Sequence, residues 1–508
     1  MIKEFRLDQL DLYLKNNTFN TVRYLDLKGE LIQKTYSELY NDALNVMNNL
    51  LKTGIKHGDS FLIVGKNSYY WLVTEVACTF IGVETIAIPE NFSQEQIIEF
   101  IDRYKTEGIA IDQSIYENMP LIGERFKKML FLNDDILRCD EMICNEVNRE
   151  QADFKIKVFT SGTTSKIKSF SINKHSTEKM MERLAKYFNM EPDDAWLICH
   201  PFSHYSHLEY ALGGLGLGYN IIIVDVTYAL LRIKKLQPSV LISVPETYYF
   251  FYNKLQNLLK DENDPEKRKE FIKEYFGGKV KGVLIGAAPS RKEVKDYFVN
   301  NGFPMYEGYG LTETGMVSIK KPSVNSDTVG KIFDGIEVTT DEAGIIHIKN
   351  DIVRTEKYDN YTDEENKRVF PEPGHIITGD IGAVDDEGYL FIKGRVKDIL
   401  ILSSGKKINA FELEEKVLGI KGVKQCLAVG NELPYIISIV VTDKTADKAE
   451  ISEQIHLINT KLAEHEKIKD VIFTEEAFTV ENNLLTRSGK IIRKAIEKKY
   501  EKDISMCY

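Results

Sequence analysis

Hydrophobic runs and amphipathic segments alternate along most of the chain. Continuous apolar stretches predict buried strands, and the segments between them show the spacing of helices. One helix is expected at residues 68–82, between two such strands. The predicted strands lie at residues 60–67, 82–90, 220–226, 239–245 and 280–289. Strands that are apolar on both faces are typical of parallel sheets covered by helices, so we expect an α/β fold.

The pattern changes after Gly344. Short strands with Asp and Gly turns follow, which predicts an antiparallel sheet or small barrel, a β-rich subdomain at about residues 330–397. From Asn409 onward the pattern is that of a small α+β unit. We therefore predict a large N-terminal α/β domain at residues 1–397 and a small α+β C-terminal domain at residues 398–508. No low-complexity linker separates them, so any hinge is a residue or two.

Length and composition fit a globular protein of at least two domains, because 508 residues exceed one ordinary core. The net charge of −11 argues against a nucleic-acid-binding surface as the main function. No apolar run approaches the roughly 20 residues that span a bilayer, and the N-terminal segment carries acidic residues where a signal peptide is apolar. The six cysteines form no CxxC pair, which indicates reduced thiols in a cytoplasmic protein.

A loop rich in hydroxyl side chains follows a predicted strand that ends at Phe159. The stretch reads VFTSGTTSKIKSF, residues 158–170. Backbone N–H and side-chain O–H groups of such a loop converge on phosphate oxygens, and Lys166 or Lys168 supplies charge. A Walker A loop is excluded, because that motif requires a glycine where Ile167 stands. For this loop taken alone, an ordinary Ser/Thr-rich surface turn is an equal alternative.

Four further motifs follow in order: GAAP (286–289), YEGYGLTET (306–314), TGDIGAVDDEGYLFIKGRVKDIL (378–400) and LLTRSGKIIRK (484–494). Together with the hydroxyl loop, and with TYSEL and GIKHGD near the start, they resemble the motifs of the ANL superfamily of adenylate-forming enzymes. This superfamily comprises acyl-CoA synthetases, adenylation domains and luciferases. The resemblance covers essentially the whole chain and is nearest to acyl- or aryl-acid ligases. The chain departs from the usual motifs at Ser165, Ile167, Ser169 and Leu484.

The resemblance implies a reaction in two steps. In the first, a substrate carboxylate attacks the α-phosphorus of ATP and expels pyrophosphate, which gives an acyl-adenylate. A carboxylate is already ionised at neutral pH, so catalysis depends on alignment and charge neutralisation and needs no general base. In the second, the acyl group passes to a thiol, either of CoA or of the phosphopantetheine arm of a carrier protein. ATP and Mg²⁺ are the implied cofactors, with CoA as a candidate acceptor.

The resemblance places one set of residues around the triphosphate. Thr312 is expected to bond the α-phosphate and Glu313 to hold Mg²⁺, a hard cation that takes carboxylate ligands. Lys490 is expected between the substrate carboxylate and the α-phosphate, and a lysine on a solvated C-terminal helix is the alternative for it. The hydroxyl loop and the lysine that follows complete this set with Thr160, Ser161, Gly162, Thr163, Thr164 and Lys168.

A second set is expected around the adenosine. Tyr309 offers a ring that stacks on adenine, and Asp380 and Arg395 are expected to bond the ribose hydroxyls. An ordinary turn aspartate and a surface cation are the alternatives for the last two. The remaining members lie in glycine-containing segments and are Gly286, Ala287, Ala288, Pro289, Gly308 and Gly310.

The two steps require different groups in one site. The resemblance implies that the C-terminal domain is mobile and rotates about Asp398, which moves Lys490 out and brings the segment ILSSGKKINAFELE, residues 401–414, in. In the alternative interpretation Asp398 only caps the segment that follows it.

The segment CHPFSHYSHLEYALGGLGLG, residues 199–218, aligns with the acyl pocket of the superfamily. Adenylation domains for α-amino acids carry an aspartate where His204 stands, and the loss of that anion argues against an amino-acid substrate. We expect His204 to be a gate beside the acyl or pantetheine channel and a fatty or aryl acid to be the substrate. A zinc site of His200, His204 and His207 is disfavoured, because Pro201 breaks the helix that would align them.

Two other functions stay open at this point. One is a stand-alone amino-acid adenylation domain that loads a carrier protein. The other is a nucleotide-binding homologue without turnover, which the altered phosphate loop favours. Neither the acid nor the acceptor thiol is identified by these residues.

Overall fold

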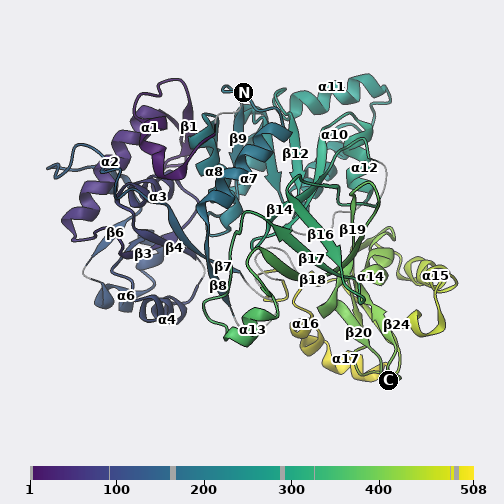
Figure 1. The fold of residues 1–508 in the computed structure, drawn as a ribbon. Coiled ribbons are helices and arrows are strands. Elements are labelled where there is room, and N and C mark those ends of the chain that lie inside the picture. Colours follow the sequence, from purple (N-terminus) through teal and green to yellow (C-terminus); the bar gives the residue numbers. More distant parts are fainter. Residues whose placement is uncertain are drawn as a thin grey trace.

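The computed structural model describes residues 4–90, 92–126, 128–160, 167–286, 292–324, 327–480, 482–485 and 491–508, and the structural statements below concern these residues. The chain forms two large sheets with helices around them, a smaller antiparallel sheet, and a C-terminal lobe at the lower right of Figure 1. The sheets of the lobe are separate from the other three. This is the mixed α/β architecture that the alternating pattern predicts.

The larger sheet has nine strands in the order β15-β14-β13-β12-β11-β9-β10-β1-β2. The strands from β13 to β1 run parallel, whereas β2, β14 and β15 are antiparallel additions at the two edges. The bounds are β1 Thr21–Leu25, β2 Leu31–Thr35, β9 Ala195–Ile198, β10 Asn220–Ile223, β11 Val240–Ser243, β12 Gly282–Ile285, β13 Met305–Leu311, β14 Gly315–Lys320 and β15 Lys331–Ile332.

The second sheet has six strands in the order β6-β5-β3-β4-β7-β8. All its pairs are parallel except β7 with β8, which are joined by the hydroxyl loop. The bounds are β3 Ser60–Gly65, β4 Glu84–Pro89, β5 Gly108–Ile111, β6 Met129–Phe131, β7 Lys155–Thr160 and β8 Lys168–Ile172. The five strands predicted from apolar runs are confirmed by β3, β4, β10, β11 and β12.

Helix α3, Tyr69–Ile81, confirms the helix predicted between the first two apolar runs, and every one of its residues is buried. The Ser68 hydroxyl accepts from the Trp71 amide at its start, and Gly82 ends it at a φ of 76°. The other helices of this part are α1 Leu10–Leu14, α2 Tyr36–Lys52, α4 Gln94–Tyr104, α5 Gln113–Tyr116, α6 Pro120–Arg125, α7 Lys174–Tyr187, α8 Tyr205–Leu217, α9 Val226–Leu236, α10 Pro245–Leu258, α11 Pro265–Tyr275, α12 Lys292–Asn300 and α13 Asp363–Lys367.

Helix α8 lies in unusually close contact with its neighbours because it carries glycines. A Cβ atom on Gly213 would lie 2.4 Å from the side chain of Met181, and one on Gly216 would lie 2.1 Å from the ring of Phe5. The corresponding distance from Gly214 to the side chain of Ile221 is 2.9 Å. All three are below the separation that carbon atoms tolerate, so the close approach requires glycine.

The smaller sheet is antiparallel in the order β16-β17-β18-β19, which confirms the short strands expected after Gly344. Its bounds are β16 Ile336–Thr340, β17 Ile345–Asn350, β18 His375–Val384 and β19 Leu390–Arg395. The C-terminal lobe contains β20 Ile399–Ile401, β21 Lys407–Asn409, α14 Ala410–Leu418, β22 Val423–Val429, β23 Ile436–Thr442, α15 Lys448–Asn459, β24 Ile468–Thr474, α16 Arg493–Lys499 and α17 Glu501–Met506.

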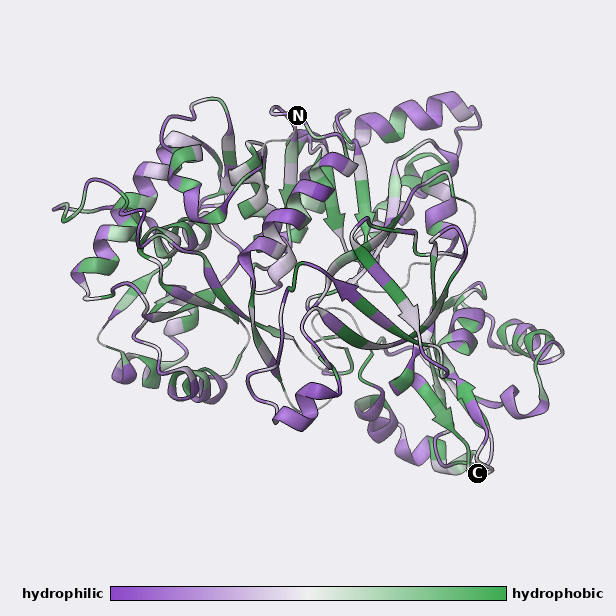
Figure 2. Cartoon of the chain, in the orientation of Figure 1, coloured by the Kyte–Doolittle hydropathy of each residue, from purple (hydrophilic) through white to green (hydrophobic). Residues whose placement is uncertain are grey.

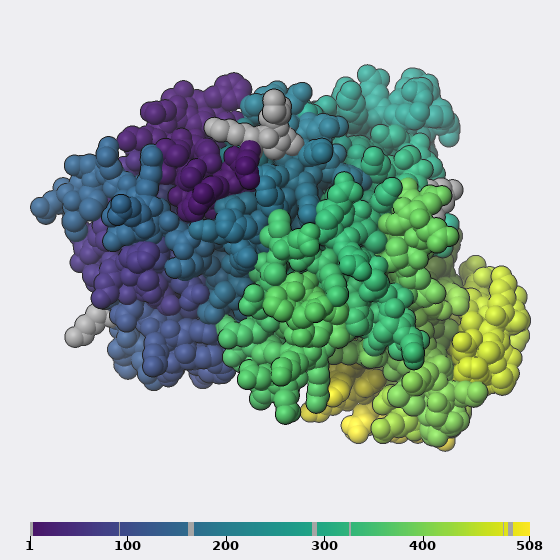
Figure 3. Space-filling view, viewed as in Figure 1, coloured from purple at the N-terminus to yellow at the C-terminus, as the bar shows by residue number. Residues whose placement is uncertain are grey.

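The hydrophobic residues divide between the lobe and the rest of the chain. Two clusters of buried residues are built entirely from the lobe, one around Leu413 and Val440 and the other around Ile439 and Tyr500. In Figure 2 the central strands are largely hydrophobic, whereas the outlying helix α11 is largely hydrophilic. The lobe, in yellow and light green, stands out at the lower right of Figure 3. Separate cores are typical of parts that move as units.

No helix among the described residues is long and apolar enough to cross a membrane. The six cysteines are free thiols in the structure.

Candidate active site

Three of the residues expected around the adenosine come together where β13 meets the small sheet. The Tyr309 hydroxyl donates a hydrogen bond of 2.6 Å to Oδ2 of Asp380. Arg395 pairs through its Nε with the other carboxylate oxygen, and it lies opposite Asp380 in the register of β18 and β19. Burial, with the Asp380 charge as a second cause, raises the pKa of the Tyr309 hydroxyl, so this group stays a neutral donor. The structure thus makes one connected group of Tyr309, Asp380 and Arg395.

The turn between β13 and β14 carries Thr312 and Glu313. Thr314 shapes it, because its Oγ1 accepts from the Leu311 amide at 2.9 Å. The Glu313 carboxylate is buried, and its Oε1 accepts a hydrogen bond of 2.6 Å from the hydroxyl of Tyr358. The expected phosphate and metal contacts therefore sit on a tight hairpin whose Glu313 side chain is held by a partner distant in sequence.

Lys168 joins the same group from the start of β8. Its Nζ donates to the Tyr358 hydroxyl at 2.9 Å and lies 3.8 Å from Oε1 of Glu313. Burial lowers the pKa of Lys168, and the Glu313 carboxylate opposes that shift. A cation, a phenol and a carboxylate are thus assembled into one cluster, Lys168–Tyr358–Glu313. Sequence reasoning singled out the first and last of these and missed Tyr358, which lies in a polar stretch without a motif.

The residues after Tyr358 hold the strand that follows the hydroxyl loop. The Asp359 amide donates to the Ser169 carbonyl at 2.8 Å, and the Asn360 side chain donates to the Ile167 carbonyl. Asp359 also pairs with Lys157 on the neighbouring strand β7 at 2.6 Å. These contacts fix the end of the loop at Ile167 and Ser169, two of the positions where the chain departs from the superfamily motif.

Thr160 closes the described part of the loop on its other side. Its Oγ1 is buried and makes no hydrogen bond within the described residues. A buried hydroxyl without a partner costs free energy unless a ligand or another group satisfies it. This is the kind of group that a phosphate oxygen would complete.

Two histidines near the amino end of α8 are neutral. His200 bonds through Nε2 to the Ser243 hydroxyl at 2.6 Å, and burial lowers the pKa of His200 to about 4. His207 is buried 4.9 Å from it, ring to ring, and burial lowers the pKa of His207 well below its ordinary value. His204 is the N-cap residue of α8. In the part of the chain that the structure describes, no three His, Cys, Asp or Glu side chains are arranged to hold a metal.

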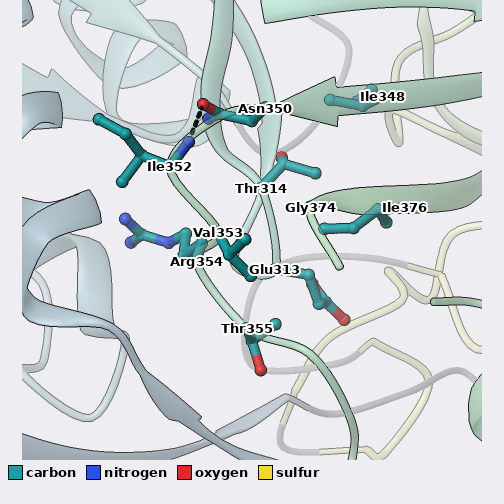
Figure 4. Close-up of a pocket in the computed structure, with 10 residues that line it drawn as sticks. All are labelled: Glu313, Thr314, Ile348, Asn350, Ile352, Val353, Arg354, Thr355, Gly374 and Ile376. Carbon is teal, nitrogen blue, oxygen red and sulfur yellow. Dashed lines mark hydrogen bonds between the residues drawn. The ribbon is translucent and has the colours of Figure 1, made fainter. Parts of the chain in front are cut away.

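The loop after β17 passes behind the hairpin turn. Figure 4 shows the side chain of Arg354 pointing away from Glu313, with Asn350 bonded to the Ile352 amide at the head of the loop. A cavity of about 10 Å³ between the loop and the turn is far too small for a substrate. This region is therefore a packed joint behind the site.

Ion pairs at Asp398 link the segment after β19 to the C-terminal lobe. Asp398 lies in a short 3₁₀ turn, Val396–Asp398, and its Oδ1 pairs with Nε of Arg493 at 3.0 Å. The same guanidinium pairs with Glu414 at 2.8 Å, and burial raises the pKa of Glu414 to about 7. Asp398 is thus bound to α16 and, through Arg493, to α14.

Several expected site residues lie outside the described residues. These are Ser161, Gly162, Thr163, Thr164, Ala287, Ala288, Pro289 and Lys490. Gly286 is described at the end of β12, where its amide donates to the Ser243 carbonyl at 3.4 Å. Gly308 and Gly310 lie on β13 against β14.

Two protein families together match most of the chain. A family described as "AMP-binding enzyme" matches residues 16–344, and one described as "AMP-binding enzyme C-terminal domain" matches residues 397–508. The chain belongs to the AMP-binding enzyme family.

Relatives of this AMP-binding enzyme match over nearly their full length. One is the 2-succinylbenzoate–CoA ligase of Bacillus cereus strain Q1, which is 24% identical and covers 92% of this chain and 96% of that protein. Another is the long-chain-fatty-acid–CoA ligase FadD15 of Mycobacterium bovis, which is 22% identical, with 95% and 93% covered.

Solved structures share the fold. The o-succinylbenzoate CoA synthetase of Bacillus subtilis, in complex with the acyl-adenylate intermediate OSB-AMP, aligns with a TM-score of 0.76 at 19% identity and covers 97% of this chain and 98% of that one. ATP-bound MatB from Rhodopseudomonas palustris aligns with a TM-score of 0.77 at 22% identity, with 98% and 99% covered. At these identities the likeness establishes the ANL fold of the AMP-binding enzyme.

Proposed function

We propose that the protein is an ATP-dependent carboxylic acid–thiol ligase. It forms an acyl-adenylate and pyrophosphate from ATP and an acyl or aryl acid, and then transfers the acyl group to a thiol, with CoA as the acceptor. The observation that carries this proposal is the meeting of two groups from distant segments. Tyr309, Asp380 and Arg395 form a polar wall suited to a nucleoside, and the Lys168–Tyr358–Glu313 cluster lies at the end of the same strand β13.

ATP would lie along β13, with its ribose at Asp380 and its phosphates toward Thr160, Thr312 and Lys168. The paired carboxylate oxygens of Asp380 are acceptors for two sugar hydroxyls, and the ion pair with Arg395 holds the carboxylate in place. Lys168 adds a cation where phosphate charge accumulates, and a phosphate oxygen would give the Thr160 hydroxyl the hydrogen bond that it does not make within the described residues. The nucleotide is thus aligned by groups that are already in place.

Glu313 fits the expected Mg²⁺. Both of its contacts within the described residues reach Oε1, which leaves Oε2 as a hard oxygen ligand of the type that Mg²⁺ prefers. When bound, Mg²⁺ supplies charge neutralisation on the phosphates. The protein's own part is to hold the carboxylate, through Tyr358, in one orientation.

The substrate acid needs no base from the protein. Its carboxylate attacks the α-phosphorus and pyrophosphate leaves, while Thr312 by a hydrogen bond and Lys490 by its charge stabilise the negative charge that develops on the transferred phosphate. Lys490 belongs to this proposal on the strength of its motif.

The charges near α8 favour an acid without an ammonium group. Glu209 is the carboxylate nearest to His204 along the helix, and its charge is compensated by an ion pair with Arg354. The imidazoles of His200 and His207 are neutral at pH 7. Neutral imidazoles offer no counter-charge to the ammonium of an amino acid, and an unpaired buried ammonium is costly. A fatty or aryl acid is the proposed substrate.

The second step is assigned to rotation of the C-terminal domain, residues 398–508, against the N-terminal domain, residues 1–397. The proposed pivot is Asp398, and the incoming face is the segment from residue 401 to residue 414. This rotation would move Lys490 out of the site and open the pantetheine channel beside His204 to the thiol.

Exchange of labelled pyrophosphate into ATP, measured with a panel of acids, tests the first step. We expect exchange with aryl or fatty acids and none with α-amino acids. Exchange with amino acids alone would replace the proposal by an adenylation domain, and ATP binding without exchange for any acid would leave a nucleotide-binding homologue. Adding CoA, or a phosphopantetheinylated carrier protein in a parallel reaction, then identifies the acceptor by the thioester formed.

A further inference from the structure

A buried ion pair joins helix α8 to the loop behind the hairpin turn. Nη1 of Arg354 lies 2.8 Å from Oε1 of Glu209, and Nη2 lies 3.0 Å from Oε2. The two side chains are 3% and 4% exposed, so water does not screen the pair. This parallel, two-point contact fixes the plane of the guanidinium as well as its position.

The third nitrogen of the same guanidinium bonds to the backbone of the hairpin turn. Nε of Arg354 donates a hydrogen bond of 2.9 Å to the backbone carbonyl oxygen of Thr312. The next residue along the chain is Glu313, whose carboxylate belongs to the Lys168–Tyr358–Glu313 cluster. Arg354 therefore bridges a rigid helix and the peptide unit that carries the expected phosphate and metal contacts.

The surroundings leave the guanidinium little freedom. Tyr205 covers one face, with its ring centroid 5.3 Å from Cζ, and Ser176 lies 3.5 Å from Nη1. Gly315, at the other end of the turn, has a φ of 68°, and a Cβ there would lie 3.3 Å from Nη1. The backbone carbonyl of Arg354 accepts from the Asn173 amide. These contacts, with the ion pair to Glu209, hold the guanidinium in one position.

Stability alone does not account for this arrangement. Burying two charges is costly, and apolar side chains of similar size often serve a protein core equally well. A methionine at position 354 could fill the volume beside a leucine at position 209, but it could not donate to Thr312. What only the ion pair supplies is a fixed donor aimed at the turn.

We infer that Arg354, held by Glu209, is a positioning residue that sets the orientation of Thr312 and Glu313 toward ATP. This inference rests on the proposed function for its kinetic consequences. Without the Nε donor the turn can shift, and a displacement of about 1 Å at reacting groups costs on the order of 10²-fold in rate. Burial tends to lower the pKa of Arg354, but Glu209 outweighs burial and raises it, so the donor stays charged.

The double variant Glu209→Leu/Arg354→Met tests this inference, because it removes the donor without leaving a buried charge unpaired. We expect it to fold with a Tm near that of the wild type, and calorimetry to show weaker binding of ATP in the presence of Mg²⁺. In acid-dependent exchange, kcat/KM for ATP should fall on the order of 10²-fold while KM for the acid stays unchanged. Wild-type ATP affinity and kinetics in the double variant would overturn the inference.

Two further variants separate positioning from folding. Arg354→Lys keeps the charge opposite Glu209 but lacks the planar fork, so it should show the same direction of change as the double variant, to a smaller extent. Lys281→Met removes an ion pair with Asp194, 2.7 Å long, at the opposite, amino ends of the strands, and should leave both ATP binding and kinetics unchanged. If the wild type exchanges pyrophosphate with no acid, the proposed function fails, and the binding measurement still decides the role of Arg354.

Discussion

Arg395 and Asp398 are three residues apart but are bound to different parts of the molecule. Arg395 pairs with Asp380 in the small sheet, whereas Asp398 pairs with Arg493 in the C-terminal lobe. Only Val396 and Lys397 lie between these two anchors, and Val396 is 43% exposed. A change in the orientation of the lobe would therefore be absorbed by very few backbone dihedrals.

The first prediction concerns this pivot. Asp398→Pro fixes φ at residue 398 and restricts residue 397, so it should hinder rotation of the lobe. We expect adenylate formation, measured by the exchange of labelled pyrophosphate into ATP, to be nearly unaffected. Thioester formation from supplied acyl-adenylate should slow by about tenfold or more, equal to about 1.4 kcal/mol of added barrier. Asp398→Asn, which keeps backbone freedom, is the matched control, and equal loss in the two variants would assign the effect to the Arg493 contact instead.

Lys490 is predicted to act in one step only. Lys490→Ala should lower the rate of adenylate formation by at least about 10²-fold, because it removes the amine proposed to stabilise the developing charge. Thioester synthesis from supplied acyl-adenylate should persist, and comparison of the two half-reactions on one preparation measures the difference. Equal loss of both half-reactions would contradict the proposed rotation of the C-terminal domain between the two steps.

Tyr358 is predicted to matter through its hydroxyl. Tyr358→Phe leaves Lys168 and Glu313 without the group that bridges them, while the ring is retained. Hydrogen bonds to charged groups contribute about 1.5–3 kcal/mol, so kcat/KM for ATP should fall about 10- to 100-fold. The Mg²⁺ concentration needed for half-maximal exchange should rise as Glu313 loses its orientation. Tyr248→Phe removes another buried hydroxyl, bonded to the Leu241 carbonyl, and should change neither quantity.

A buried acid in α3 is predicted to make stability depend on pH. Glu75 is buried and accepts from the Thr85 hydroxyl at 2.6 Å, and burial raises the pKa of Glu75 to about 8 from its ordinary 4.5. Between these values the folded chain holds a proton that the unfolded chain has released, so stability falls as pH rises. The expected loss through this group by pH 7 is on the order of 3 kcal/mol.

The test is the change in Tm between pH 5 and pH 8. Glu75→Gln, which is neutral throughout, should flatten this dependence relative to the wild type, and the same substitution at the exposed Glu124 serves as control. Asp112 and Glu414 act in the same direction, because burial raises the pKa of Asp112 to about 6 and that of Glu414 to about 7. The difference between variant and wild type, not the absolute slope, therefore isolates Glu75. An unchanged slope would mean that Glu75 is ionised in the folded state.

The sequence predicts the elements and the motif residues because both are encoded locally. Apolar runs identify β3, β4 and the central strands of the larger sheet, and the motif YEGYGLTET singles out Thr312 and Glu313. Arg354 and Glu209 escape such reasoning, since 145 residues separate them and no motif gives either of them a role. Tyr358 escapes it for the same reason, and the neutrality of His200 follows from burial that only the folded chain reveals.

The glycines of α8 have a consequence for how this enzyme could change over time. The side chains of Phe5, Met181 and Ile221 pack directly against the backbone of α8, so this helix has no space in which to tilt, slide or rotate. A change in acid preference would therefore have to come from substitutions of side chains at the amino end of α8, since the backbone of the helix cannot move.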